Sequence, residues 1–170
     1  SRTEYAEILS NYRLEKMTII IKGYTKSYGL ITRKDDPKKI GDVQDLLKNN
    51  IKIISKSLDR YEGKITEYYL KLQTEENEKF KRITHKNNKN WSKVKSNATM
   101  IAILSDGKAD VAFGTENLAA ASNLNYIPLL GMNFDFIIKE SSLQKSPVRD
   151  LLEVIKSNQF KSEIIKIKGL

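Results

Sequence analysis

The chain has 170 residues, of which 39% are hydrophobic and 8% aromatic, enough for a folded domain with one sizeable core or two small lobes. Cysteine is absent, which excludes disulfides, thiolate metal sites and thiol catalysis and fits a reducing compartment, so we expect a cytoplasmic location. No apolar run reaches the roughly 18 residues that a membrane span needs, and the first residues lack the apolar segment of a signal peptide. The net charge of +9 keeps nucleic acid among the candidate partners.

Hydrophobic spacing predicts alternating helices and strands in the first half of the chain. Apolar side chains recur at helical spacing in some segments, whereas short runs of β-branched residues in others indicate buried strands. The predicted helices cover residues 4–15, 42–47 and 61–73, and the predicted strands cover residues 17–21, 29–32 and 51–54.

The second half continues this alternation after a polar stretch. Residues 74–95 lack a clear period and predict a loop, or a helix with loose ends. The later predicted helices cover residues 98–104, residues 116–121 and a segment beginning at Pro147, and the predicted strands cover residues 110–113, 126–129 and 134–138. Strands that alternate with helices are typical of an α/β fold with a largely parallel sheet and right-handed crossovers.

Few residues of this sequence could carry catalysis. The single histidine, His85, lies in the polar stretch without an apolar or acidic neighbour in sequence, which favours a solvated loop residue. The acidic cluster at residues 75–78 is typical of a solvated helix end, and no glycine-rich phosphate loop is present. We therefore expect no catalytic residue, no metal and no cofactor, and an enzyme ranks last among the candidate functions.

Polar residues follow several predicted strands at the starts of helices, and they form the candidate ligand site. In open α/β sheets, ligands bind outside the carboxyl ends of the strands, where helix N-termini present free N–H groups and favour anions. Capping of the next helix explains Ser96 and Asn97 about as well as ligand contact does. The predicted ligand-binding residues, for a small anion, are Lys26, Ser27, Lys56, Ser57, Ser96, Asn97 and Thr115.

The stretch from Lys79 to Lys95 suggests an alternative function. It contains seven Lys or Arg residues and no acid, and Phe80 and Trp91 lie between the charges, a pattern that could bind nucleic acid by phosphate contacts and stacking. A surface loop kept soluble by lysine explains the same pattern, and no recognition helix or RNA-binding motif accompanies it. In this alternative, the ligand cleft would be vestigial. The nucleic-acid site would consist of Lys81, Arg82, Lys86, Lys89 and Lys93.

The segment from Ser96 to Leu129 carries a pattern of turns, strands and an alanine-rich helix that resembles a known family. It is similar to the periplasmic-binding-protein-like (type II) domain that occurs beside molybdopterin-biosynthesis proteins and winged-helix regulators. The matching residues are Leu104, Gly107, Ala109, Asp110, Gly114, Ala119 to Ala121, Leu124, Tyr126 to Leu129, Phe134 and Asp135. Weaker matches at residues 26–30 and 36–40 extend the resemblance to about residues 12–160.

The resemblance implies two α/β lobes that are joined by two crossing strands, with the ligand between the lobes. The crossing strands would be Gly29 to Thr32 and about Tyr126 to Leu129. The implied first lobe comprises residues 1–34 and 123–170 and is truncated, because the family normally begins this lobe with a further strand–helix unit. The implied second lobe comprises residues 35–122.

The resemblance also implies a function: binding or sensing of molybdate, tungstate or a molybdopterin-related compound. Such a sensor would act in transcription regulation beside a fused or separate DNA-binding domain, as a monomer or an oligomer. The family's oxyanion loop is degenerate here at residues 55–63, where Asp59 and Glu62 would repel an anion.

Overall fold

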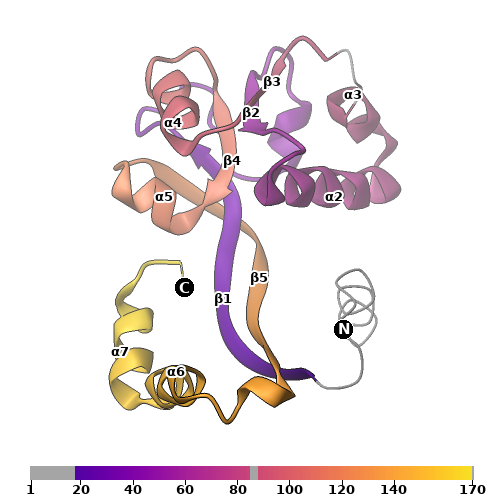
Figure 1. The fold of residues 1–170 in the computed structure, drawn as a ribbon. Helices are drawn as coiled ribbons and strands as arrows, with labels where there is room; N and C mark the ends of the chain where they lie inside the picture. Colours follow the sequence, from indigo (N-terminus) through magenta and orange to yellow (C-terminus); the bar gives the residue numbers. More distant parts are fainter. Residues whose placement is uncertain (1–17, 85–87, 170) are drawn as a thin grey trace. The chain divides into compact units, whose positions relative to one another are not determined.

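The computed structural model describes residues 18–84 and 88–169, and Figure 1 shows the arrangement of their helices and strands. The predicted helix at residues 4–15, as well as His85 and Lys86, lies outside the described residues. The strands are β1 (Thr18–Thr32), β2 (Ile53–Lys56), β3 (Trp91–Val94), β4 (Val111–Thr115) and β5 (Asn125–Lys139). The helices are η1 (Gln44–Leu47), α2 (Tyr61–Glu76), η2 (Glu78–Phe80), α3 (Lys81–Thr84), α4 (Asn97–Ser105), α5 (Glu116–Ala121), η3 (Glu140–Ser142), α6 (Ser146–Lys156) and α7 (Asn158–Lys166).

The five strands form one mixed sheet in the order β3-β2-β4-β1-β5. β2 runs parallel to β3 and to β4, because helices return the chain between these strands. β1 runs antiparallel to β4, with Gly29 opposite Gly114. The predicted α/β class is confirmed, whereas the expected parallel arrangement holds only for β2, β3 and β4.

β1 and β5 are long strands, and each contains two segments that the sequence predicted as separate strands. They are neighbours in the sheet, as expected for the crossing strands. Glycine permits their close approach at two places. A Cβ atom added at Gly23 would lie 2.0 Å from the Phe134 carbonyl oxygen, and one at Gly29 would lie 2.0 Å from the Ile127 carbonyl oxygen. Gly23 therefore allows β1 to pack closely against β5, and β1 continues beyond it.

The described chain divides into two compact units. The large unit comprises residues 26–132 and Gly169, and the small unit comprises residues 18–25 and 133–168. β1 and β5 each run from one unit into the other. The division into lobes at residues 34/35 and 122/123 stays a prediction.

The large unit buries apolar residues on both faces of its strands. Ile31 of β1 and Ile54 of β2 pack with Met100 and Leu104 of α4 in one cluster. Tyr28, an odd number of residues from Ile31, lies on the opposite face, where its hydroxyl hydrogen bonds to Thr66 of α2 at 2.8 Å. Helices therefore cover both faces, which explains why every residue of β2 and β4 is buried.

The described residues of the basic stretch, 79–84 and 88–95, do not form the exposed loop that the sequence suggested. Phe80 is 0% exposed and Ile83 is 5% exposed, and both lie in short helices. Trp91 begins β3, which pairs with β2, and its indole N–H donates to the Ser55 hydroxyl at 2.8 Å. The loop prediction was wrong because the Lys and Arg side chains occupy the exposed positions between a few buried apolar residues.

The small unit combines the outer parts of β1 and β5 with α6 and α7. The Tyr24 and Phe134 rings stack with their centroids 5.3 Å apart, and the Gly23 N–H donates to the Asp135 carboxylate at 3.0 Å. Pro147 lies in the first turn of α6, as predicted. No helix among the described residues is long and apolar enough to cross a membrane.

Candidate anion-binding pocket

A pocket of about 180 Å³ lies at the carboxyl ends of β2 and β4 in the large unit. Lys56 is the last residue of β2 and Thr115 is the last residue of β4, and both line the pocket with Lys26 and Asn97. The structure thus brings together four of the seven predicted ligand-binding residues. The other lining residues are Glu62, Met100, Phe113, Gly114, Asn117, Leu118 and Ala121.

Lys56 is the most unusual residue of the pocket, because its side chain is only 7% exposed. Its Nζ donates to the Lys95 carbonyl oxygen at 3.0 Å. An ammonium group has three donors, and no carboxylate of the described residues forms an ion pair with this one. Burying a charge is costly unless the charge is paired, so the site favours an anionic ligand.

The first turn of α4 contributes Asn97 and Met100 to the pocket lining. Ser96 is the N-cap, and its hydroxyl oxygen accepts the Thr99 N–H at 3.0 Å and hydrogen bonds to the Thr99 hydroxyl at 2.7 Å. The Thr99 N–H is therefore not free for a ligand. The N–H groups of Asn97 and Ala98 form no hydrogen bond within the described part of the chain, as is usual in a first helical turn.

Three of the predicted residues are not among those that line the pocket, because their hydroxyls serve internal contacts. Ser96 caps α4. The Ser27 hydroxyl hydrogen bonds to the Tyr126 hydroxyl at 2.8 Å, and burial raises the pKa of Tyr126 to about 12. The Ser57 hydroxyl donates to the Asp59 carboxylate and so lowers the pKa of Asp59.

Two polar residues join the predicted ones. Glu62 of α2 lines the pocket, in line with the expected repulsion of an anion, whereas Asp59 does not. Asn117 was missed, because it lies in the alanine-rich helix α5, whose composition indicates packing. Its buried Oδ1 has no hydrogen-bond partner among the described residues. Within the same residues, no group of His, Asp or Glu is arranged to hold a metal ion.

The alternative nucleic-acid site has exposed charges but little aromatic surface. Lys81, Arg82, Lys89 and Lys93 are exposed, and Lys86 lies outside the described residues. Phe80 is fully buried and cannot stack on a base. The Lys93 Nζ lies 4.8 Å from the centre of the Trp91 ring, a cation–π contact within the protein.

Comparison with known proteins places this geometry in a family. A 75-residue stretch is 29% identical to an uncharacterized protein in the 5' region of a ferredoxin 2Fe-2S gene of Clostridium pasteurianum, covering 44% of this chain and 66% of that protein. The fold resembles the substrate-binding domain of a molybdenum ABC transporter from Clostridium difficile, with a TM-score of 0.66, 14% identity, and coverage of 98% of this chain and 73% of that one. It also resembles L-phospholactate-bound PEB3, with a TM-score of 0.61, 17% identity, and coverage of 88% and 67%.

The matched stretch spans about two thirds of the length of the curated relative, and the two solved structures are longer than the present chain. At such low identities the solved structures establish the fold alone. The model of the PBP superfamily domain matches residues 3–156, nearly the whole chain. The chain therefore belongs to the PBP superfamily and has the α/β fold of the type II periplasmic-binding-protein-like domains.

Proposed function

We propose that the pocket at the ends of β2 and β4 binds a small anion and that the domain acts as a binding or sensing module. The observation that carries this proposal is Lys56, a buried residue that lines the pocket and whose ammonium lacks an ion-pair partner among the described residues. Lys26 and the first turn of α4 add positive potential. Together they outweigh the single lining carboxylate, Glu62.

The proposed ligand class is an oxyanion such as molybdate or tungstate, or a molybdopterin-related anion. A volume of about 180 Å³ suits a compact ion. One structural neighbour is the substrate-binding domain of a molybdenum ABC transporter, and another binds L-phospholactate, so related folds accept small anions. We propose binding without catalysis, because among the described residues the Glu62 carboxylate forms no ion pair with Lys26 or Lys56, so no acid–base pair is assembled. A cytoplasmic location, a DNA-binding partner and a role in transcription regulation stay predictions.

Calorimetric titration of the full chain with molybdate, tungstate, sulfate and phosphate tests the proposal. Lys56→Met keeps the apolar stem but removes the charge, so it should weaken binding by about 1.5–3 kcal/mol, the usual size of a hydrogen bond to a charged group. Lys26→Met should weaken binding less, because Lys26 is only half-buried. Thermal shift gives a second readout, since a ligand that binds only the native state raises the apparent stability.

The matched control is Lys64→Met, because Lys64 is an exposed lysine of α2 that does not line the pocket. The affinity of Lys64→Met for each anion should equal that of the wild type. Equal affinities for wild type and Lys56→Met would remove Lys56 from the site. No binding of any of the four anions would contradict the oxyanion proposal.

A second candidate function is nucleic-acid binding through Lys81, Arg82, Lys89 and Lys93, whose exposure favours it. Phosphate contacts release counterions, so affinity for DNA or RNA should fall steeply as salt increases. Reversing these four charges should abolish retention on a nucleic-acid column while far-UV circular dichroism stays unchanged. Retention that survives the reversal would exclude this surface.

A further inference from the structure

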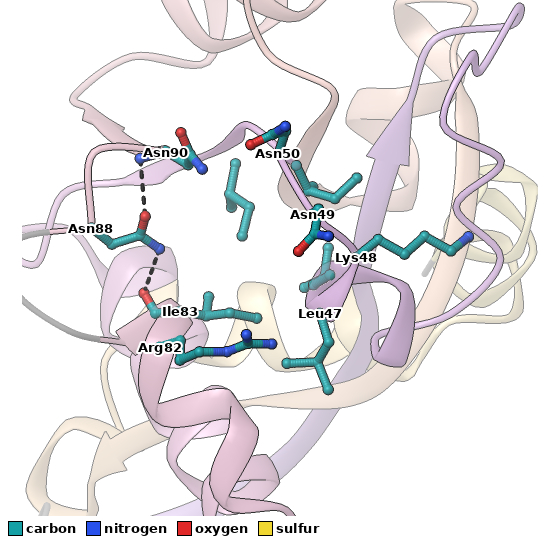
Figure 2. A pocket seen from close by; sticks show the side chains of 11 residues that line it. Leu47, Lys48, Asn49, Asn50, Arg82, Ile83, Asn88 and Asn90 are labelled. Carbon is teal, nitrogen blue, oxygen red and sulfur yellow. Dashed lines mark hydrogen bonds between the residues drawn. The ribbon is translucent and has the colours of Figure 1, made fainter.

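A second pocket in the large unit opens at the other edge of the sheet, where β2 and β3 begin. It has a volume of about 240 Å³ and is lined by residues of η1, of the segment before β2 and the start of β2, of α3, and of residues 88–90 before β3 (Figure 2). It shares no lining residue with the anion pocket, which lies at the carboxyl ends of the strands. We refer to it as the asparagine pocket, after Asn49, Asn50, Asn88 and Asn90.

The apolar part of the asparagine pocket belongs to the core and is therefore firmly placed. Ile51, Ile53 and Ile83 line it and are 4%, 2% and 5% exposed. Asn88 fixes one side of the pocket, because its side-chain amide donates to the Ile83 carbonyl at 3.1 Å and accepts the Asn90 N–H at 2.9 Å. The Asn90 carbonyl in turn accepts the Ile53 N–H at 2.7 Å. The cavity is thus fixed to the sheet before any ligand arrives.

Apart from Asn88, much of the polar part of the pocket is not engaged by other described residues. Among the described residues, the side chains of Asn49, Asn50, Asn90 and Arg82 form no hydrogen bond or ion pair. In Figure 2 the Arg82 guanidinium reaches across the pocket toward Leu47, whereas Lys48 points away. The Lys48 Nζ is engaged outside the pocket, at 2.8 Å from the Asp45 carboxylate.

The charge of the pocket is positive, because no described lining residue is an Asp or Glu. A guanidinium presents a planar fork of donors that matches a carboxylate, and it is less strongly hydrated than an ammonium. Asparagine amides supply both donors and acceptors for further polar atoms of a ligand. The apolar side chains of Ile51, Ile53 and Ile83 cannot interact favourably with an inorganic ion, but they can bury a hydrocarbon group.

We propose that the asparagine pocket binds a small organic acid, with its carboxylate on Arg82, its hydrocarbon part against Ile51, Ile53 and Ile83, and any further polar atoms on the asparagine amides. The proposal does not depend on the function of the anion pocket. A sugar fits less well, since no aromatic ring is among the described lining residues to stack on it.

The test is a titration of the ¹⁵N-labelled full chain, followed by NMR, with 4-methylpentanoate as the probe. The neutral 4-methylpentanamide has the same shape without the charge, and acetate has the charge without the hydrocarbon part. We expect 4-methylpentanoate to shift the side-chain amide signals of Asn49, Asn50 and Asn90 saturably. The amide and acetate should each bind at least about tenfold more weakly, the factor for a lost charge-assisted hydrogen bond or a lost buried side chain.

Three variants assign the contact. Arg82→Gln should weaken the binding of 4-methylpentanoate at least about tenfold, whereas Arg149→Gln, the same change at an exposed residue of α6, should leave it unchanged. Lys56→Met should also leave it unchanged, which separates this site from the anion pocket. Circular dichroism of each variant confirms that the fold is retained.

Several results would overturn the proposal. They are no saturable shift of the asparagine amides, equal affinity for the acid and its amide, or an Arg82→Gln variant that binds like the wild type. A fourth is that only oligonucleotides shift these signals and lose affinity in Arg82→Gln, which would assign Arg82 to the nucleic-acid surface. Failure of the anion pocket to bind oxyanions would leave the proposal intact, because the two pockets share no lining residue.

Discussion

The two compact units differ in how they use their apolar residues. In the large unit, residues 26–132, strands and helices enclose a core in which Leu30, Phe113 and Leu104 are fully buried. Among the described residues of the small unit, Ile155 is the only hydrophobic residue that is buried. Its other large apolar side chains are often exposed, such as Val154 at 53% and Ile165 at 77%.

This difference indicates where the stability of the domain resides. Hydrophobic stabilisation scales with the apolar area removed from water, so most of it comes from the large unit. A pair of strands with two helices, as in the small unit, is marginal by itself. Both candidate pockets are built from the large unit alone, so changes in the small unit should leave ligand binding largely intact.

The strongest test of this comparison uses two leucines on helices. Leu104→Ala in α4 should lower the free energy of unfolding by about 2–5 kcal/mol, because it opens a cavity in the core. Leu151→Ala in α6, where the side chain is 45% exposed, should cost less than about 1 kcal/mol. Urea denaturation followed by circular dichroism measures both. Similar losses for the two variants would contradict the comparison.

A smaller effect is expected at two tyrosines. The Tyr28 hydroxyl is buried, where it donates to the Glu62 carbonyl at 3.1 Å or hydrogen bonds to Thr66 at 2.8 Å, so Tyr28→Phe should cost about 1–2 kcal/mol. Tyr24→Phe, in the small unit, should change the stability by no more than about 0.5 kcal/mol, because its ring stacking is retained. The same denaturation experiment at pH 7 compares them. A loss at Tyr24 that equals the loss at Tyr28 would mean that the small unit also buries a specific contact.

Alkaline pH provides a related test. Burial, above all, raises the pKa of Tyr28 above the value of about 10 that an exposed phenol has in the unfolded chain. The contribution of the neutral Tyr28 hydroxyl to the free energy of unfolding is therefore fully present below pH 10. It is lost as the pH rises toward the folded-state pKa, at up to about 1.4 kcal/mol per pH unit. The stability difference between wild type and Tyr28→Phe should shrink accordingly above pH 10. A difference that stays constant up to pH 11 would contradict the assignment of a shifted pKa to Tyr28.

The sequence predicted the fold class because periodicity and the motif order from Ser96 to Leu129 are local signals. It did not predict that β1 and β5 are continuous, since Gly23 weakens a strand pattern and its role depends on Phe134, more than a hundred residues away. It also misjudged residues 79–95, because in that stretch the charges outnumber Phe80 and Ile83, the residues that face the core.

The candidate site was predictable only in part. Lys56, Asn97 and Thr115 were found because strand ends and the helix starts that follow them meet at one edge of an α/β sheet, whereas Lys26 lines the pocket from within β1 and not from a strand end. Ser27 and Ser57 have the same sequence signal, but their hydroxyls bond to Tyr126 and Asp59 instead, and no local pattern reveals such partners. The asparagine pocket was not predicted, because its lining residues come from two parts of the chain, residues 46–53 and 82–90. These parts meet at the opposite edge of the sheet, and no local pattern reveals that they do.

The smallest expected effect concerns two serine N-caps on helices of equal length. Ser96 caps α4 and Ser157 caps α7, each helix has nine residues, and each hydroxyl oxygen accepts the N–H of the residue three positions later. Loss of such a cap costs about 1 kcal/mol of helix stability. In α4, where Met100 and Leu104 are buried, Ser96→Ala should transmit this loss to global unfolding. In α7, which has no buried residue, Ser157→Ala should mainly increase local opening of the helix. Urea denaturation measures the first effect and amide hydrogen exchange measures the second. If Ser157→Ala lowered the global stability as much as Ser96→Ala, the small unit would have to unfold together with the large unit.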